Sequence, residues 1–118
     1  MALSEMNYIE GGGSVVYEEY GRSITADTPI DVGFAPKTVI LVCHTPNYAR
    51  TLFVFYWDSS NPNYQYCGEF GSTSYGTQYS MPYTGTALLI KDISGSTVTI
   101  GYNSSVAPIT VDIFAFPN

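Results

Sequence analysis

The stretch that decides the fold is IDVGFAPKTVILVCH, residues 30–44, in which a bend is followed at once by an apolar run. Gly33 accepts a positive φ without steric cost, Pro36 fixes its own φ at about −65°, and Ala35 is biased towards extended geometry by the proline after it. Residues 39–43 are all apolar, and the run is too short for a helix and is bounded by turn residues. It predicts the central strand of a sheet, covered on both faces.

Further strands are expected on both sides of this strand. Residues 14–20 and 22–26 are separated by Gly21 and predict either an opening hairpin or one interrupted strand. After the turn at 45–50, residues 51–57 (TLFVFYW) are nearly all strand formers and are expected to form a hairpin with residues 37–44.

The C-terminal third shows the clearest alternation. Residues 97–102 place Val98, Ile100 and Tyr102 on one face, and residues 109–116 place every second side chain on one face, beginning at Ile109. Each of these segments therefore predicts a strand with alternating faces.

Residues 58–86 form an excursion rich in Gly, Pro and Tyr, in which we expect two short strands around 64–70 and 75–81. Residues 87–91 (ALLIK) predict a return to regular strand structure. No segment has an apolar period of helical length. Seven or eight short strands with turns between them predict an all-β fold, an antiparallel β-sandwich of jelly-roll-like or immunoglobulin-like type.

The chain has 118 residues, which corresponds to one domain. Residues 1–13 are mostly polar, end in three glycines and predict a flexible N-terminal arm, whereas residues 14–118 predict the sandwich. The arm either docks onto a neighbouring subunit or is a frayed terminus.

The net charge of −6 and the pI near 4.3 disfavour partners that carry phosphate. We therefore expect no nucleic-acid partner and no binding to anionic membranes. No apolar run is long enough to insert into a membrane and no signal peptide is recognised, so the chain is expected to be made in a cytosol. There, Cys43 and Cys67 are expected to stay reduced, with Cys43 as a small buried apolar residue.

Three predicted strands are apolar on both faces, at residues 39–43, 52–57 and 87–90. A strand in a two-layer sandwich needs only one buried face, so the second apolar face requires a cover. We expect that cover to be another subunit, which predicts a homo-oligomer. The alternative is that residues 58–86 fold over one sheet face within a single chain.

The order of these segments resembles β-sandwich domains of bacteriophage tail-fibre, baseplate and receptor-binding proteins over residues 24–116. The residues that carry the resemblance lie in a GF-x-P-K-x-V corner, a turn-Gly-Thr-Val hairpin and a closing aromatic-Ala strand: Gly33, Phe34, Pro36, Lys37, Val39, Ile93, Gly95, Thr97, Val98, Phe114 and Ala115. The Phe-Ala-Phe ending and the start without a fibrous shaft depart from this pattern and imply a small free-standing protein.

The resemblance implies a structural protein of a phage or prophage particle. Such a protein is made in the bacterial cytoplasm, assembles as a homo-oligomer, with a trimer favoured, and lies on the virion beside other virion proteins. Its implied role is host attachment, or decoration of the capsid or tail.

The residues best suited to binding lie in or beside the excursion. Aromatic side chains stack on sugars or anchor protein contacts, and carboxylates and amides bond to hydroxyls. This hypothesis predicts a host-glycan or receptor surface, or a lectin-like module, formed by Trp57, Asp58, Asn61, Asn63, Tyr64, Tyr66, Tyr75, Gln78 and Tyr79. The alternative is that Tyr64, Tyr66, Tyr75, Tyr79 and Tyr83 pack the end of the sandwich or a subunit interface.

Catalytic and metal chemistry find less support. His44 is the single histidine and no triad motif surrounds it. One His with two distant Cys does not make a metal site, so no metal or cofactor is expected. Asp58 and Glu69 are the pair that a glycosidase would use, but loop carboxylates are far more often solvated. We therefore expect a non-enzymatic protein.

Overall fold

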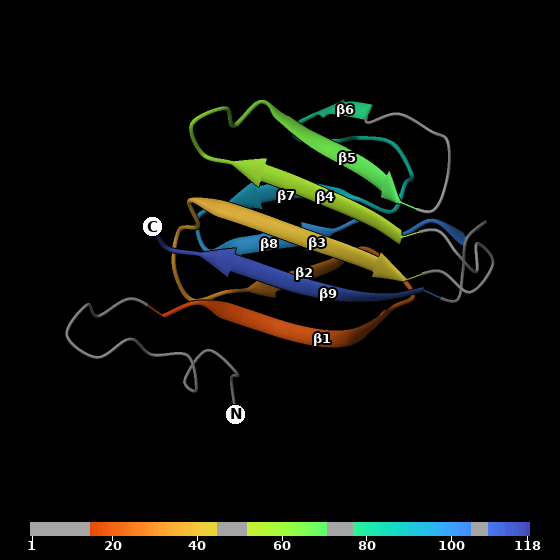
Figure 1. Cartoon of the computed structure of the whole chain (residues 1–118), viewed down its shortest axis with the longest axis horizontal. Coiled ribbons are helices and arrows are strands. Elements are labelled where there is room, and N and C mark those ends of the chain that lie inside the picture. Colours follow the sequence, from red (N-terminus) through yellow and green to blue (C-terminus); the bar gives the residue numbers. More distant parts are fainter. Residues whose placement is uncertain (1–14, 45–51, 71–76, 105–108) are drawn as a thin grey trace.

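The computed structural model describes residues 15–44, 52–70, 77–104 and 109–118, and in Glu69 and Phe70 it describes only the backbone. These residues form an all-β structure of two antiparallel sheets packed face to face, which confirms the predicted sandwich (Figure 1). The predicted arm at residues 1–13 lies outside the described residues.

The described part of the chain contains nine strands, one more than the upper predicted number. In order across it, the six-stranded sheet consists of β1 (Tyr17–Ile24), β9 (Ile109–Phe116), β3 (Thr38–His44), β4 (Leu52–Asp58), β5 (Tyr64–Phe70) and β6 (Thr77–Ser80). The three-stranded sheet consists of β2 (Thr28–Asp31), β8 (Thr97–Ile100) and β7 (Ile90–Ser94).

The corner at residues 33–37 carries the chain from the small sheet to the large one. Gly33 has a φ of +87°, and its N–H donates to Asp31 Oδ1 at 2.9 Å. The strand that follows, β3, is interior and pairs with both β9 and β4. The prediction of a central strand and of its hairpin with the next segment is confirmed.

The opening segment is one interrupted strand and not a hairpin. β1 pairs with β9 from Tyr17 to Ile24, and the register shifts between Glu19 and Arg22. Gly21 lies in this irregularity with a φ of +66°. The two predicted alternatives are thereby resolved.

The predicted strand at residues 87–91 is wrong in its position. Leu88 and Leu89 are buried but lie before β7, which begins at Ile90. The backbone of this approach is held by Gly101, whose N–H donates to Leu89 O at 2.8 Å. Residues 88–90 are apolar because this connection passes into the core, where all three side chains are buried. The segment is therefore not one of the strands with two apolar faces.

The core lies between the two sheets and confirms the predicted alternation of β8 and β9. From the large sheet it takes Val39, Leu41, Cys43, Val111, Ile113 and Ala115, and from the small sheet Ile30, Ile90, Val98 and Ile100. Cys43 is buried, as expected, and burial raises the pKa of its thiol. Cys67 is buried as well, and no disulfide joins the two cysteines.

One polar side chain, that of Gln65 on β5, is fully buried in this core. Its amide accepts a hydrogen bond from Ile90 N at 3.0 Å and donates to Ile90 O. Since Ile90 begins β7, this pair of bonds joins the large sheet to the small one. No local pattern in the sequence predicts the burial of Gln65, because its partner Ile90 lies 25 positions away.

Candidate functional site

The residues predicted to form one binding surface are divided between two faces of the large sheet. Trp57 and Tyr79 point inward and contact the core, whereas Tyr64, Tyr66 and Gln78 stand at outward positions of β5 and β6. Asp58 ends β4, and Asn61 and Asn63 follow in the turn before β5, whereas Tyr75 lies outside the described residues. The structure therefore does not bring these residues together as one site.

Asp58 anchors the turn between β4 and β5. Its Oδ1 accepts from Ser60 N at 2.9 Å and from Ser60 Oγ at 2.8 Å, and its Oδ2 accepts from Tyr56 OH at 2.9 Å and from Thr38 Oγ1 at 3.2 Å. The bonds from Ser60, followed by the one from Tyr56, lower the pKa of Asp58 to about 2. Asp58 is thus ionised at neutral pH and unsuited to donate a proton as a glycosidase acid.

His44, the other residue considered for catalysis, lies at the end of β3 on the outward side of the large sheet. Its Nε2 is 3.0 Å from Asp112 Oδ2. Among the described residues, no three His, Cys, Asp or Glu side chains lie close enough together to hold a metal ion. The same residues contain no helix with the length and apolar character needed to cross a membrane.

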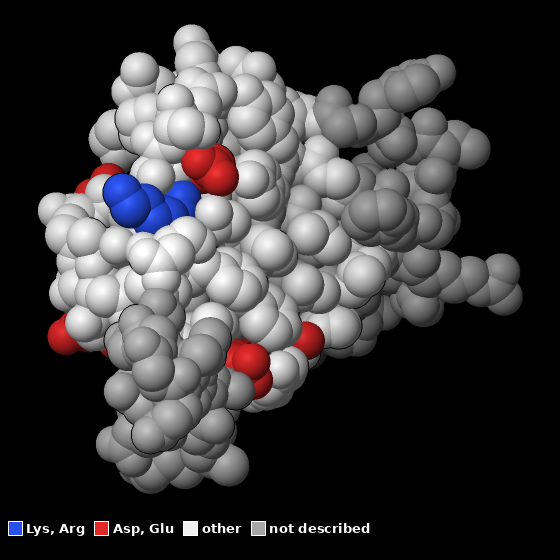
Figure 2. All heavy atoms as spheres, turned by 60° about the vertical axis from the view of Figure 1, so that its left-hand side comes forward, with Lys and Arg blue, Asp and Glu red and all other residues white. Residues whose placement is uncertain are grey.

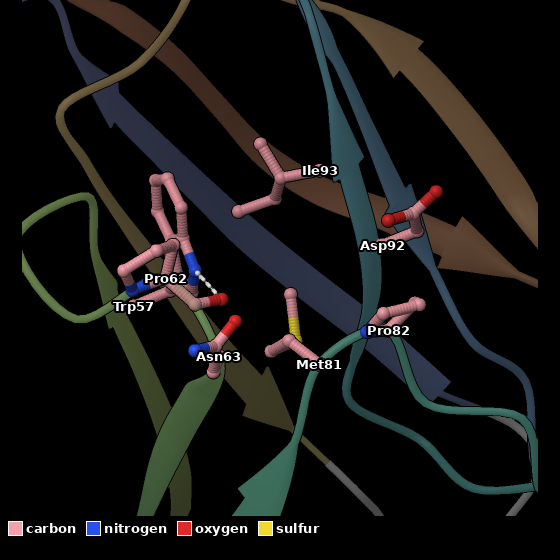
Figure 3. A pocket seen from close by; sticks show the side chains of 7 residues that line it. All are labelled: Trp57, Pro62, Asn63, Met81, Pro82, Asp92 and Ile93. Carbon is pink, nitrogen blue, oxygen red and sulfur yellow. Dashed lines mark hydrogen bonds between the residues drawn. The ribbon is translucent and has the colours of Figure 1, made fainter.

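Trp57 forms one wall of a small pocket between the two sheets (Figure 3). The pocket is also lined by Asn63, by Met81, which follows β6, and by Ile93 of β7. Its volume is about 170 Å³. This is below the roughly 300–1,000 Å³ typical of ligand sites. Trp57 is only 6% exposed and its indole N–H donates to Pro62 O at 3.1 Å, so its ring offers little surface for stacking on a sugar.

The exposed tyrosines lie on the outward side of the large sheet. Tyr56 and Tyr66 are direct partners on β4 and β5, each 41% exposed, Tyr64 is 39% exposed, and Tyr20 on β1 is 58% exposed. Tyr56 and Tyr20 are among the residues that the binding hypothesis did not include. The position of Tyr56 follows from strand alternation, because Tyr56 is the neighbour of the inward-facing Trp57. Tyr20 likewise follows Glu19, which pairs with the inward-facing Ile113.

Three of these tyrosine hydroxyls already have partners within the chain. Tyr56 donates to Asp58, Asn61 Nδ2 donates to Tyr66 OH at 2.8 Å, and Tyr20 donates to Glu18 Oε1 at 3.0 Å. These three side chains are thus partly exposed, while their hydroxyl groups are bonded within the chain.

These tyrosines belong to a larger apolar surface, which we call the outer face. It consists of the outward apolar side chains of the six-stranded sheet, which are Tyr20, Ile40, Val42, Leu52, Val54, Tyr56, Tyr64, Tyr66, Phe114 and Phe116. In Figure 1 the large sheet lies in front of the small one, and no described segment crosses in front of it. The described parts of residues 58–86 extend the sheet as β5 and β6 or approach β7, so they do not cover the outer face.

The outward side of the small sheet is different in character. Its outward positions on β2, β8 and β7 are occupied by Pro29, Asp31, Thr97, Thr99, Asp92 and Ser94. This is the polar surface that a two-layer sandwich normally presents to water.

The carboxylates at outward positions of the large sheet already accept hydrogen bonds, Glu18 from Tyr20 OH and Asp58 from Ser60 and Tyr56. Asp112 on β9 accepts from Gly21 N at 2.8 Å and pairs with His44. By register, no Lys or Arg stands at an outward position of the described strands of this sheet. In Figure 2, the charged side chains form small separate groups on a mostly uncharged surface.

Comparisons of the chain with family models, with curated protein sequences and with solved structures find no match.

Proposed function

We propose that this chain is a non-enzymatic structural protein of a phage or prophage virion, where it acts as a homo-oligomer in host attachment or in decoration of the capsid or tail. The observation that carries the assembly part of this proposal is the apolar outer face. Its centre, on β3 and β4, carries Ile40, Val42 and Val54, and no described segment crosses in front of these strands (Figure 1). Contiguous apolar patches of more than a few hundred Å² are rare on monomers and mark contact surfaces.

The virion part of the proposal comes from the resemblance of the corner, the hairpin and the closing strand to phage tail proteins. The described residues are compatible with it. Gly33 and Gly95 both adopt the positive φ that their turns require. Phe34 in the corner packs against the core, and Ala115 in the closing strand is part of it.

A lectin-like function is the second candidate, and the exposed rings of Tyr56, Tyr64 and Tyr66 are the observation that favours it. Against it, the hydroxyls of Tyr56 and Tyr66 and the carboxylate of Asp58 already bond to each other or to neighbouring groups. A sugar needs free donors and acceptors as well as an aromatic face.

The test of the proposed function is the solution mass of the purified full-length chain, measured by light scattering at several concentrations. One chain has a mass of 12.9 kDa, and a homo-oligomer gives a whole multiple of this mass that persists on dilution. The mass of a single chain at every concentration would contradict assembly. Binding on a glycan array that is lost in Tyr64→Ala and kept in Tyr83→Ala would then favour the lectin.

A further inference from the structure

We infer that the outer face of the large sheet packs face to face against the outer face of a second copy, so that two sandwiches form a four-layer dimer. This inference rests on the proposed homo-oligomer and names its interface and its symmetry. The occupant is a second copy related by a two-fold axis.

The size of the outer face fits this arrangement. Six strands spaced by about 4.8 Å span about 25–30 Å, and seven residues at about 3.3 Å each span about 23 Å. This flat footprint, about 600–700 Å², is that of the whole outward side of the sheet, and it includes the polar outward residues of β6, Gln78 and Ser80, as a rim. Stable interfaces bury about 800 Å² on each partner.

The polar groups of the outer face allow it to be covered. An interface that buries an unpaired carboxylate or hydroxyl incurs a desolvation cost. Here Asp58 and Asp112 are already bonded within the chain, as are the hydroxyls of Tyr56 and Tyr66. Covering these four groups therefore leaves none of them without a hydrogen-bond partner.

A second copy is the partner that fits this chemistry. It brings an apolar surface of the same size, and a two-fold contact covers both outer faces at once.

The experiment compares the masses of the full-length wild type and two matched variants by light scattering. Val42→Lys places a charge at the centre of the outer face, and Thr99→Lys places the same charge at an outward position of the small sheet. We expect twice the mass of one chain for the wild type and for Thr99→Lys, and the mass of a single chain for Val42→Lys.

Three results would overturn the inference. A wild type that stays monomeric contradicts both the inference and the proposed homo-oligomer. A trimer, with three times the mass of one chain, keeps the homo-oligomer and contradicts face-to-face pairing alone. A dimer that persists in Val42→Lys also keeps the homo-oligomer and contradicts pairing through the outer face.

A second variant serves if Val42→Lys fails to fold. Val54→Cys is a small change near the centre of the outer face, opposite Val42, whereas Cys43 and Cys67 are buried. Under mild oxidation we expect Val54→Cys to form an intermolecular disulfide dimer and Thr99→Cys to stay reduced. Equal cross-linking of the two variants, or none in Val54→Cys, would contradict the inference.

Discussion

The two sheets of this sandwich share a core but present opposite chemistry to the outside. Thr97 and Thr99 face outward on the small sheet, whereas Val42 and Val54 face outward on the large one. A sandwich needs apolar side chains only on its two inner faces. The outer face of the large sheet is therefore more apolar than the fold requires, which points to a partner.

The comparison requires that the two sheets stay packed against each other. We expect the hydrogen bonds between Gln65 and Ile90, which join the two sheets, to contribute most to the free energy of unfolding among the contacts tested. Gln65→Leu leaves the N–H and C=O of Ile90 buried without partners. Each such group costs roughly 1–3 kcal/mol, so we expect a loss of about 4 kcal/mol in the free energy of unfolding. Denaturant titration measures it. Gln78→Leu, on the exposed strand β6, is the control and should change stability by less than about 0.5 kcal/mol.

Two valines of β3 sharpen the comparison between the inner and outer faces. Val39 is fully buried in the core and Val42 is half-buried on the outer face. Val39→Ala is expected to lower the free energy of unfolding by about 2 kcal/mol through lost burial and a cavity. Val42→Ala should cost less than about 1 kcal/mol when measured at a dilution where the copies are separate. Equal losses would mean that the outer face is packed within one chain.

The tyrosines test whether the outer face behaves as an interface with a centre and a rim. Tyr66→Ala removes a ring on an interior strand, and we expect it to weaken self-association about tenfold to a hundredfold. Tyr20→Ala removes a more exposed ring on the edge strand β1 and should weaken it less than about fivefold. Sedimentation equilibrium measures both dissociation constants. A larger effect at Tyr20 would contradict the proposed centre.

The smallest effect concerns Asp58 at the border of the outer face. Its folded-state pKa of about 2 lies below its ordinary value of 3.8, so the folded chain binds fewer protons between these pH values. Its stabilising contribution is complete above about pH 4 and is lost as the pH falls towards 2. We therefore expect the wild type to unfold at a higher temperature than Asp58→Asn at pH 7, with the gap closing between pH 4 and 2. A gap that stays constant would contradict the hydrogen bonding of Asp58.

The strands most accurately predicted from the sequence are those whose signal is local. β9 was expected at residues 109–116 and lies at Ile109–Phe116, because every second side chain is apolar and one register satisfies the core. The corner was predictable because its φ of +87° at position 33 is one that glycine adopts at no steric cost and other residues rarely adopt.

The errors come from contacts between distant residues. Residues 87–89 are apolar because they enter the core from a connection, which their pattern cannot distinguish from a buried strand. Gln65 is buried because Ile90, 25 positions away, presents its backbone to it. The predicted binding surface was divided for a simpler reason, because alternation sends Trp57 and Tyr66 to opposite faces.

The most direct test of the central claim is an isotope-filtered NMR experiment on a mixture of labelled and unlabelled full-length chains, which detects contacts only between copies. The account predicts intermolecular contacts from the methyl groups of Ile40, Val42 and Val54 and none from those of Thr97 and Thr99. Contacts that arise from the small sheet instead, or no intermolecular contacts at all, would contradict it.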